Sequence, residues 1–167
     1  MSELPVLVFG TGRIGQQIAH AVKSLGGVVF GVNTTGRPVE GFDATYVISD
    51  YQEALAKSQV VVDGLPGTKE TENFFDEHFF QQFNQLFLFI NIGRGTTLNQ
   101  DDLLSAIDDS RVKYAALDVT TPEPLPMNHP LFERPQILLT QHTSWGEQES
   151  AGRVGGLFRL FEKNVPS

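Results

Sequence analysis

Short apolar runs alternate along this chain with longer amphipathic stretches, which is the pattern of strands and helices in turn. Several runs are continuously apolar, as expected for parallel strands that are covered on both faces. The apolar runs predict strands at Val6–Phe9, Val28–Val32, Ala44–Ile48, Val60–Val62, Leu86–Asn91, Tyr114–Val119 and Ile137–Thr140. Helical spacing predicts helices at Arg13–Leu25, Tyr51–Ser58, Asn73–Phe83, Gln100–Asp108 and Glu147–Glu162.

Alternating strands and helices predict an α/β fold, a Rossmann-type doubly wound parallel sheet of about seven strands. We expect a single domain over residues 1–167, since this length supports one sizeable core. The third predicted helix carries aromatic residues on one stripe, which favours core packing over a partner surface: Phe75, Phe79 and Phe83, with Phe74 and Phe80 beside them. Ligands of such sheets bind beyond the carboxyl ends of the strands, so the residues after each strand are the functional candidates.

A glycine-rich turn follows the first predicted strand, with the sequence G-T-G-R-I-G from Gly10 to Gly15. In a dinucleotide-binding turn, Gly10 permits the tight bend, Gly12 lets the backbone approach a pyrophosphate, and Gly15 allows close packing of helix and strand. The helix that begins near Arg13 and Ile14 points free N–H groups at the phosphates. The motif alone is weak in a Gly-rich chain, but the strand before it and the helix after it favour dinucleotide binding over a plain turn.

The residues after the second strand bear on which cofactor is bound. Many NAD sites place an acidic residue here to hold the ribose hydroxyls, whereas this chain has Asn33. Asn33 does not repel a 2′-phosphate, and Thr34, Thr35 and Arg37 offer hydrogen bonds or charge to one. The cofactor is therefore expected to be NAD or NADP, with NADP favoured. The alternative is that these residues make a turn and nothing more.

Two further turns follow the fourth and fifth predicted strands. Leu65 and Pro66 form a stiff turn placed to lie against a cofactor. Ile92, Gly93 and Arg94 follow the fifth strand, and a further glycine comes after the arginine. An arginine at this edge offers a planar, permanently charged fork for a carboxylate or carbonyl oxygen. The alternative is a surface arginine in a flexible turn.

The last two strand ends add titratable groups. Asp118 closes the sixth predicted strand, Glu123 lies between two prolines after it, and His142 follows the seventh strand. A histidine beside a carboxylate is a proton donor whose charged form is stabilised. Together with a dinucleotide-binding turn, Arg94, Glu123 and His142 make a candidate hydride-transfer site.

Composition narrows the classes of partner and chemistry. The net charge of −8 argues against a nucleic-acid groove and against an anionic membrane surface. The absence of cysteine excludes disulfides, thiol catalysis and Cys-zinc sites, and no metal site is expected. The longest apolar run, Leu86–Ile90, is too short to span a bilayer. We expect a cytoplasmic protein that binds small molecules.

Taken in order, these motifs resemble the NAD(P)-binding domain of the D-isomer-specific 2-hydroxyacid dehydrogenases. The resemblance extends from Val6 to about Ser150 and rests on the glycine turn, L-P at 65–66, I-N-I-G-R-G at 90–95, A-L-D-V at 116–119, P-E-P-L at 122–125, H-P-L at 129–131 and L-T-Q-H at 139–142. Two positions depart from the family pattern. Gln141 stands where the family usually has proline, and Asn33 replaces the acidic ribose residue, which puts plain NAD preference in doubt.

The resemblance implies an NAD(P)-dependent oxidoreductase acting on a small 2-oxo or 2-hydroxy acid. Arg94 would bind the substrate, His142 would be the acid/base, and Glu123 would orient the histidine. Asp118 would hold the nicotinamide carboxamide, and Arg94 and His142 would also touch the cofactor. Formate dehydrogenase is a related alternative, but that enzyme has glutamine where Glu123 stands.

The family enzymes also carry a second domain that closes over the substrate, and that domain has no counterpart in this sequence. We therefore expect the chain by itself to bind cofactor but to have poor activity. Family subunits meet largely through their cofactor domains, which predicts a homodimer. The alternative from another class is a non-catalytic dinucleotide-binding or dimerisation module, similar to the corepressors among the relatives.

Overall fold

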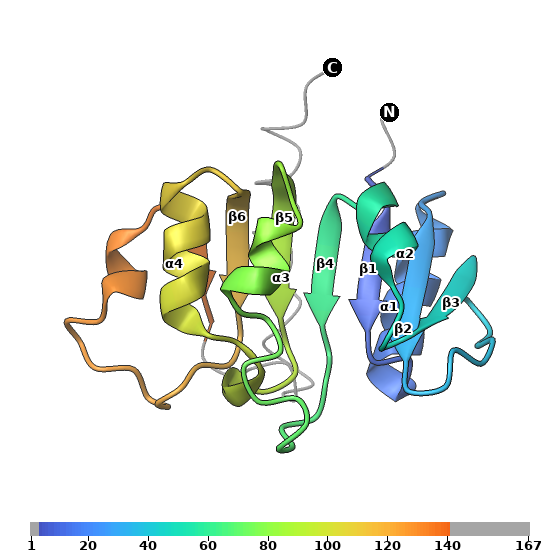
Figure 1. Ribbon diagram of the computed structural model, residues 1–167, viewed down its shortest axis with the longest axis horizontal. Coiled ribbons are helices and arrows are strands. Elements are labelled where there is room, and N and C mark those ends of the chain that lie inside the picture. The colour runs from blue at the N-terminus through green and yellow to red at the C-terminus, as the bar shows by residue number, and fades with distance from the viewer. Residues whose placement is uncertain (1–3, 141–167) are drawn as a thin grey trace.

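A computed structural model describes residues 4–140, and these build a seven-stranded sheet in which every neighbouring pair is parallel. The strand order is β3-β2-β1-β4-β5-β6-β7 (Figure 1). The strands are β1 (Val6–Phe9), β2 (Val29–Asn33), β3 (Ala44–Val47), β4 (Val60–Asp63), β5 (Leu86–Asn91), β6 (Val112–Leu117) and β7 (Ile137–Leu139). The α/β class, the parallel sheet and its seven strands are thus confirmed, with strand ends shifted by at most two residues.

Helices cover both faces of the sheet. They are α1 (Arg13–Ser24), α2 (Gln52–Lys57), α3 (Glu77–Gln81) and α4 (Gln100–Asp108), with short 3₁₀ turns η1 (Gly95–Thr97) and η2 (Pro130–Glu133). In Figure 1, α2, α3 and α4 lie in front of the sheet and α1 lies behind it. None of the helices between residues 4 and 140 has the length and apolar character that crossing a bilayer requires. The predicted helix Glu147–Glu162 lies outside the described residues.

The two faces of the sheet belong to two separate cores, and alternate residues of β1 enter each of them. Leu7 and Phe9 pack in the larger core, under α2, α3 and α4. Val6 and Val8 pack in the smaller core, against α1. All four side chains are buried, so β1 is covered on both sides, as its continuously apolar sequence predicts.

The predicted helix Asn73–Phe83 is wrong over its first four residues. Asn73 has φ +50°, and Phe75 pairs instead with the segment after β5, since its N–H donates to the Thr97 carbonyl at 3.0 Å. The helix begins only after Asp76, whose side chain caps it by accepting from the N–H of Phe79 at 3.0 Å. The aromatic stripe is nevertheless core, because Phe75, Phe79 and Phe83 are all buried, as is Phe80 beside them, and Phe74 is half-buried against the same core.

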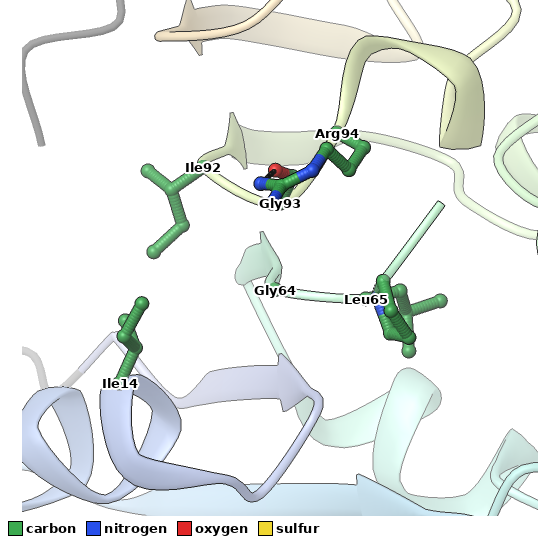
Figure 2. Close-up of a pocket in the computed structure, with 7 residues that line it drawn as sticks. Ile14, Gly64, Leu65, Ile92, Gly93 and Arg94 are labelled. Atoms are coloured by element: carbon green, nitrogen blue, oxygen red, sulfur yellow. Dashed lines mark hydrogen bonds between the residues drawn. The ribbon is translucent and has the colours of Figure 1, made fainter. Parts of the chain in front are cut away.

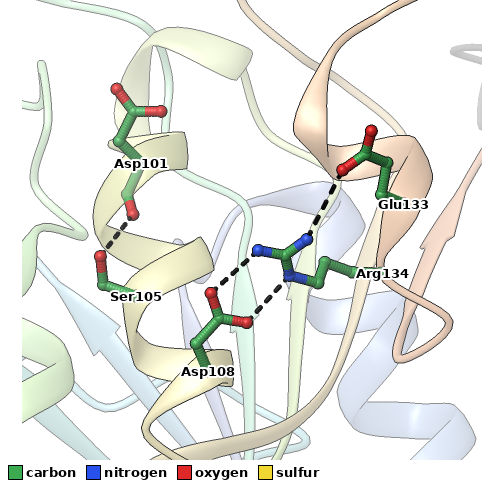
Figure 3. Close-up of polar contacts among 5 residues, drawn as sticks. All are labelled: Asp101, Ser105, Asp108, Glu133 and Arg134. Carbon is green, nitrogen blue, oxygen red and sulfur yellow. Dashed lines mark hydrogen bonds and ion pairs between the residues drawn. The ribbon is translucent and has the colours of Figure 1, made fainter.

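The segment that returns from β6 to β7 is tied to the end of α4. Arg134 donates through Nε and Nη2 to the two carboxylate oxygens of Asp108, both at 2.9 Å (Figure 3). This ion pair holds the pKa of Asp108 below its usual value. Both partners are reached by water, so the pair fixes geometry more than it adds stability.

Candidate functional site

The chain reverses its direction of travel across the sheet at the junction of β1 and β4. β2 and β3 lie on one side of β1, whereas β5, β6 and β7 follow on the far side of β4. The backbone ladder continues beyond this pair, since the N–H of Gly64 donates to the carbonyl of Phe9 at 2.9 Å. Crevices at the carboxyl ends of such strands are where open α/β sheets bind ligands.

The glycine turn between β1 and α1 has the geometry that its sequence predicts. Gly10 has φ +97°, and a Cβ there would lie 2.8 Å from the Gly64 carbonyl. A Cβ on Gly15 would lie 2.1 Å from the carbonyl of Gly10, so helix and turn pack in direct contact. Gly12 differs, because a Cβ there would have no atom within 4 Å. Gly12 therefore faces open space in front of the first turn of α1, where a ligand can approach the backbone.

A cavity of about 210 Å³ lies beside this turn, at the carboxyl ends of the strands. The cavity is lined by Gly64 and by six residues that the sequence predicts to contact a cofactor: Ile14, Leu65, Pro66, Ile92, Gly93 and Arg94. The side chains of Ile14 and Ile92 point toward each other across the cavity (Figure 2). Ile14 is 41% exposed, so the cavity offers apolar surface that no described residue covers.

The loop after β5 is held in shape by the side chain of Asn91. Its Oδ1 accepts from the N–H of Gly93 at 3.0 Å, and its Nδ2 donates to the carbonyl of Arg94 at 3.1 Å. A Cβ on Gly93 would lie 2.6 Å from the carbonyl of Leu65, so only glycine lets the two cavity walls approach this closely. Arg94 is exposed, and its Nη1 donates to the carbonyl of Gly93 at 2.8 Å. Arg94 makes no ion pair within residues 4–140, so its charge is not neutralised by the described part of the chain.

The loop after β2 is organised by Asn33, which is the last residue of that strand. Its Nδ2 donates to Thr11 Oγ1 at 3.2 Å and to the carbonyl of Arg37 at 2.9 Å, while its Oδ1 accepts from the N–H of Thr35 at 3.1 Å. The amide thus ties this loop to the glycine turn. Thr34 and Arg37 are exposed, and the Arg37 guanidinium has no partner among the described residues. The turn interpretation of Asn33 is therefore supported, and it leaves Arg37 available to a ligand.

The ends of β6 and β7 meet through Asp118, which directly follows β6. Its N–H donates to the carbonyl of Asn91 at 2.9 Å, and its carboxylate accepts from the hydroxyl of Thr140, just after β7. Glu123 is exposed on the loop beyond Asp118. His142 lies outside the described residues, so its position relative to Arg94 and Glu123 stays a prediction.

Two residues that hold the loops of this site in place belong to no recognisable sequence motif, and no role was predicted for them from the sequence. Gln100, buried in the first turn of α4, accepts from the N–H of Thr121 at 3.0 Å and donates to its carbonyl at 2.7 Å, which anchors the loop that carries Glu123. Asp63, at the end of β4, is completely buried, and this burial raises its pKa to about 7. The one signal in the sequence was that an acid ends an otherwise apolar strand.

Residues 1–144 match the family model of the D-isomer specific 2-hydroxyacid dehydrogenase NAD binding domain. The chain is 38% identical over 145 residues to the human glyoxylate reductase/hydroxypyruvate reductase, an alignment that covers 85% of this chain and 44% of that protein. The crystal structure of phosphoglycerate dehydrogenase from Lactobacillus plantarum is similar with a TM-score of 0.84 and 39% identity, over 96% of this chain and 53% of that one. A probable 2-hydroxyacid dehydrogenase from Rhizobium etli, solved with NADP, HEPES and tartaric acid, is similar with a TM-score of 0.81 and 32% identity, over 99% of this chain and 54% of that one.

The chain spans about half the length of the curated relatives it matches. Within that half, the family match covers most of the chain and includes every strand of the sheet. The glycine turn and the cavity at the point of reversal also agree with a dinucleotide-binding domain. The chain therefore belongs to the D-isomer-specific 2-hydroxyacid dehydrogenase family, of which it carries the NAD-binding domain.

Proposed function

We propose that this chain binds NADP(H), and NAD(H) more weakly, as the cofactor domain of a reductase for small 2-oxo acids. The observation that carries the proposal is the cavity beside the glycine turn, lined by predicted cofactor residues from three separate loops. The open space in front of Gly12 suits a pyrophosphate at the N-terminus of α1. The facing side chains of Ile14 and Ile92 suit an apolar ring between them.

Unpaired positive charge supports an anionic ligand in this crevice. The chain carries a net charge of −8, yet the guanidinium groups of Arg13, Arg37 and Arg94 all follow carboxyl ends of strands. Within residues 4–140, none of the three forms an ion pair. We assign Arg13 to the pyrophosphate region, Arg37 to the 2′-phosphate and Arg94 to the substrate carboxylate.

The preference for NADP rests on the loop after β2. Asn33 is neutral, and its side-chain amide forms hydrogen bonds with the backbone of Thr35 and Arg37 in the turn. No carboxylate at this position therefore repels a 2′-phosphate. Arg37 is exposed four residues further on. A structural relative with 32% identity was solved with NADP bound, which supports the same preference here.

The catalytic roles follow the family pattern. A bound nicotinamide supplies the hydride for reduction of the 2-oxo group. Arg94 binds the carboxylate of the substrate and polarises its carbonyl, since its guanidinium is charged and unpaired among the described residues. His142 donates the proton to the developing alkoxide oxygen, and Glu123 stabilises its charged form. Glyoxylate and hydroxypyruvate, named for the human relative, are the first substrates to test.

A pair of glycine substitutions separates cofactor binding from folding. Gly12→Ala places a methyl group in open space at φ −73°, so we expect the free energy of unfolding to change by less than about 0.5 kcal/mol. The same methyl group obstructs the approach of a pyrophosphate, so the affinity for NADPH should fall by roughly tenfold or more. Gly15→Ala should instead destabilise the fold, because its methyl group meets the Gly10 carbonyl.

Isothermal titration with NADPH and urea denaturation measure the two effects. Gln17→Ala, at an exposed position of α1, is the control and should leave affinity and stability unchanged. Binding by Gly12→Ala that equals wild type would contradict the assignment of the glycine turn. A wild-type chain that binds neither NADPH nor NADH would contradict the proposed function itself.

A further inference from the structure

The side chain of Asp63 is tied to two of the three loops that line the cavity, the loop after β4 and the loop after β5. Its backbone lies in β4, between Phe9 of β1 and Asn91 of β5, and its side chain is completely buried. Oδ1 accepts from the N–H of Leu65 at 2.9 Å, and Oδ2 lies within hydrogen-bond distance of the hydroxyl of Thr97. One carboxyl group therefore contacts the Leu65-Pro66 wall directly and reaches the opposite wall through η1.

The hydroxyl of Thr97 has a second oxygen close to it. Thr97 Oγ1 lies 2.6 Å from the carbonyl oxygen of Arg94. A hydroxyl has one proton, whereas a carbonyl oxygen and an ionised carboxylate can only accept. If Asp63 were ionised, one of the two oxygen–oxygen contacts of Thr97 would contain no proton. A protonated Asp63 completes both, since its O–H donates to Thr97 Oγ1 and the Thr97 O–H donates to Arg94.

The electrostatic surroundings agree with this proton count. Burial raises the pKa of Asp63 to about 7, although the hydrogen bonds that Thr97 and Leu65 would donate to its ionised form act in the opposite direction. The charged residues on neighbouring strand ends are Arg94 after β5, Arg13 after β1 and Asp118 after β6. Asp63 forms no ion pair within the described residues, and the Arg94 guanidinium donates to the carbonyl of Gly93 instead.

We infer that Asp63 is a positioning residue that, as a neutral carboxylic acid, holds the two walls of the cavity together, and that dinucleotide affinity falls when it loses its proton. Ionisation leaves the Thr97–Arg94 contact or the Thr97–Asp63 contact without a proton, which loosens the Arg94 wall. It also places a buried negative charge beneath an anionic ligand. The inference rests on the proposed function, because it takes this cavity as the dinucleotide site.

The pH dependence of binding tests the inference. We expect the dissociation constant for NADPH to rise above pH 7 in the wild type, by up to tenfold per pH unit for one linked proton. Asp63→Asn keeps an acceptor for Leu65 and supplies an N–H to Thr97, so it should bind NADPH with this rise removed. The two proteins share every other titrating group and the same ligand phosphates, so the difference between their pH profiles isolates Asp63.

Two further measurements keep the test decisive if Asp63→Asn folds poorly. Thr97→Val should lower affinity at all pH values, whereas Thr97→Ser, which keeps the hydroxyl, should behave as wild type. Without any ligand, the infrared difference spectrum between pH 6 and pH 9 should show the carbonyl stretch of a protonated carboxyl, absent from Asp63→Asn.

Equal pH profiles for wild type and Asp63→Asn, or no protonated carboxyl in the wild type at pH 6, would overturn the inference. Failure of the wild type to bind any dinucleotide would contradict the proposed function and the coupling with it. The infrared signal would then still decide whether Asp63 is neutral in the fold.

Discussion

Asp63 is buried and has no ion-pair partner within residues 4–140, and this links the stability of the fold to pH. In the folded chain its pKa is about 7, whereas an unperturbed aspartate has a value of 3.8. Between these two pH values the folded state holds a proton that the unfolded state has released. Stability from this group is therefore highest at acidic pH, falls as the pH rises toward 7, and is level above that.

Urea denaturation at pH 5 and pH 8 checks this linkage. Each pKa unit corresponds to about 1.4 kcal/mol, so the wild type should lose on the order of 2 to 3 kcal/mol over this range relative to Asp63→Asn. Folding lowers the pKa values of Asp43 and Asp108, so these two groups make stability rise with pH. They do so only at pH values near or below the usual aspartate pKa of 3.8, which lies outside the range from pH 5 to pH 8. The same loss in both proteins would show that Asp63 does not titrate in this way.

Arg37 offers a second prediction for a single residue. Its guanidinium has no partner among the described residues, so Arg37→Ala removes charge without breaking an ion pair or a side-chain hydrogen bond within that part of the chain. We expect NADPH affinity to fall by roughly tenfold, the value of one charge-assisted hydrogen bond. NADH affinity should change little, because NADH lacks the 2′-phosphate. Calorimetric titration with both cofactors measures the ratio of the two affinities. A clear preference for NADH that is unchanged by the substitution would exclude the assignment of Arg37 to the 2′-phosphate.

The residues that line the cavity could be predicted where a local sequence pattern determined their position, although their contact with a cofactor stays a prediction. The glycine turn, Leu65-Pro66 and Ile92 to Arg94 each follow an apolar strand, and parallel strands bring their carboxyl ends to one edge. Asp63 was not predictable, because its protonation depends on burial and on Thr97, which reaches it from another loop. The role of His142 stays a prediction.

Among the elements, α3 shows what hydrophobic periodicity reports and what it does not. The spacing of Phe75, Phe79 and Phe83 indicated burial, and all three are buried. It did not indicate backbone conformation, because the pairing of Phe75 with the segment beyond β5 competes with the first helical turn. The capping side chain of Asp76, rather than the aromatic stripe, marks where the helix begins.

The contact between α4 and the loop after β6 gives a prediction for a single element. Gln100 donates to and accepts from the backbone of Thr121, so Gln100→Ala leaves both backbone groups without these partners. We expect a loss of about 1 to 3 kcal/mol in the free energy of unfolding and faster hydrogen exchange at the Thr121 N–H. Ser105→Ala, at an exposed site of the same helix, is the control and should stay within about 0.5 kcal/mol of wild type. Equal stability of the two variants would show that the two hydrogen bonds between Gln100 and Thr121 do not hold the loop.

For the whole molecule, we predict that the 167-residue chain binds cofactor but turns over 2-oxo acids far below an ordinary rate of roughly 10 per second. Arg94 and Glu123 are exposed, so water screens the charges that would act on a substrate. Misplacement by about 1 Å can cost on the order of a hundredfold in rate. NADPH absorbance with glyoxylate and hydroxypyruvate, using His142→Ala as the blank, measures the rate. Ordinary turnover that disappears in the blank would refute the prediction.

The homodimer expected from the family resemblance is a separate prediction about the whole molecule. Static light scattering at tens of micromolar should give twice the mass of the 18.4 kDa chain. A monomer mass across that concentration range would reject it.

During synthesis, β1 is made before every other strand of the sheet, yet it finishes in the middle, between β2 and β4. Val6 of β1 pairs with Val60 of β4. At a synthesis rate of about 5 to 20 residues per second, β4 is therefore made roughly 3 to 10 seconds after β1. β2 and β3 can join it in that interval, but its other edge stays open. The nascent chain therefore exposes the unpaired backbone N–H and C=O groups of a strand whose side chains are all apolar, and chaperones or other nascent chains can reach them until β4 has emerged from the ribosome.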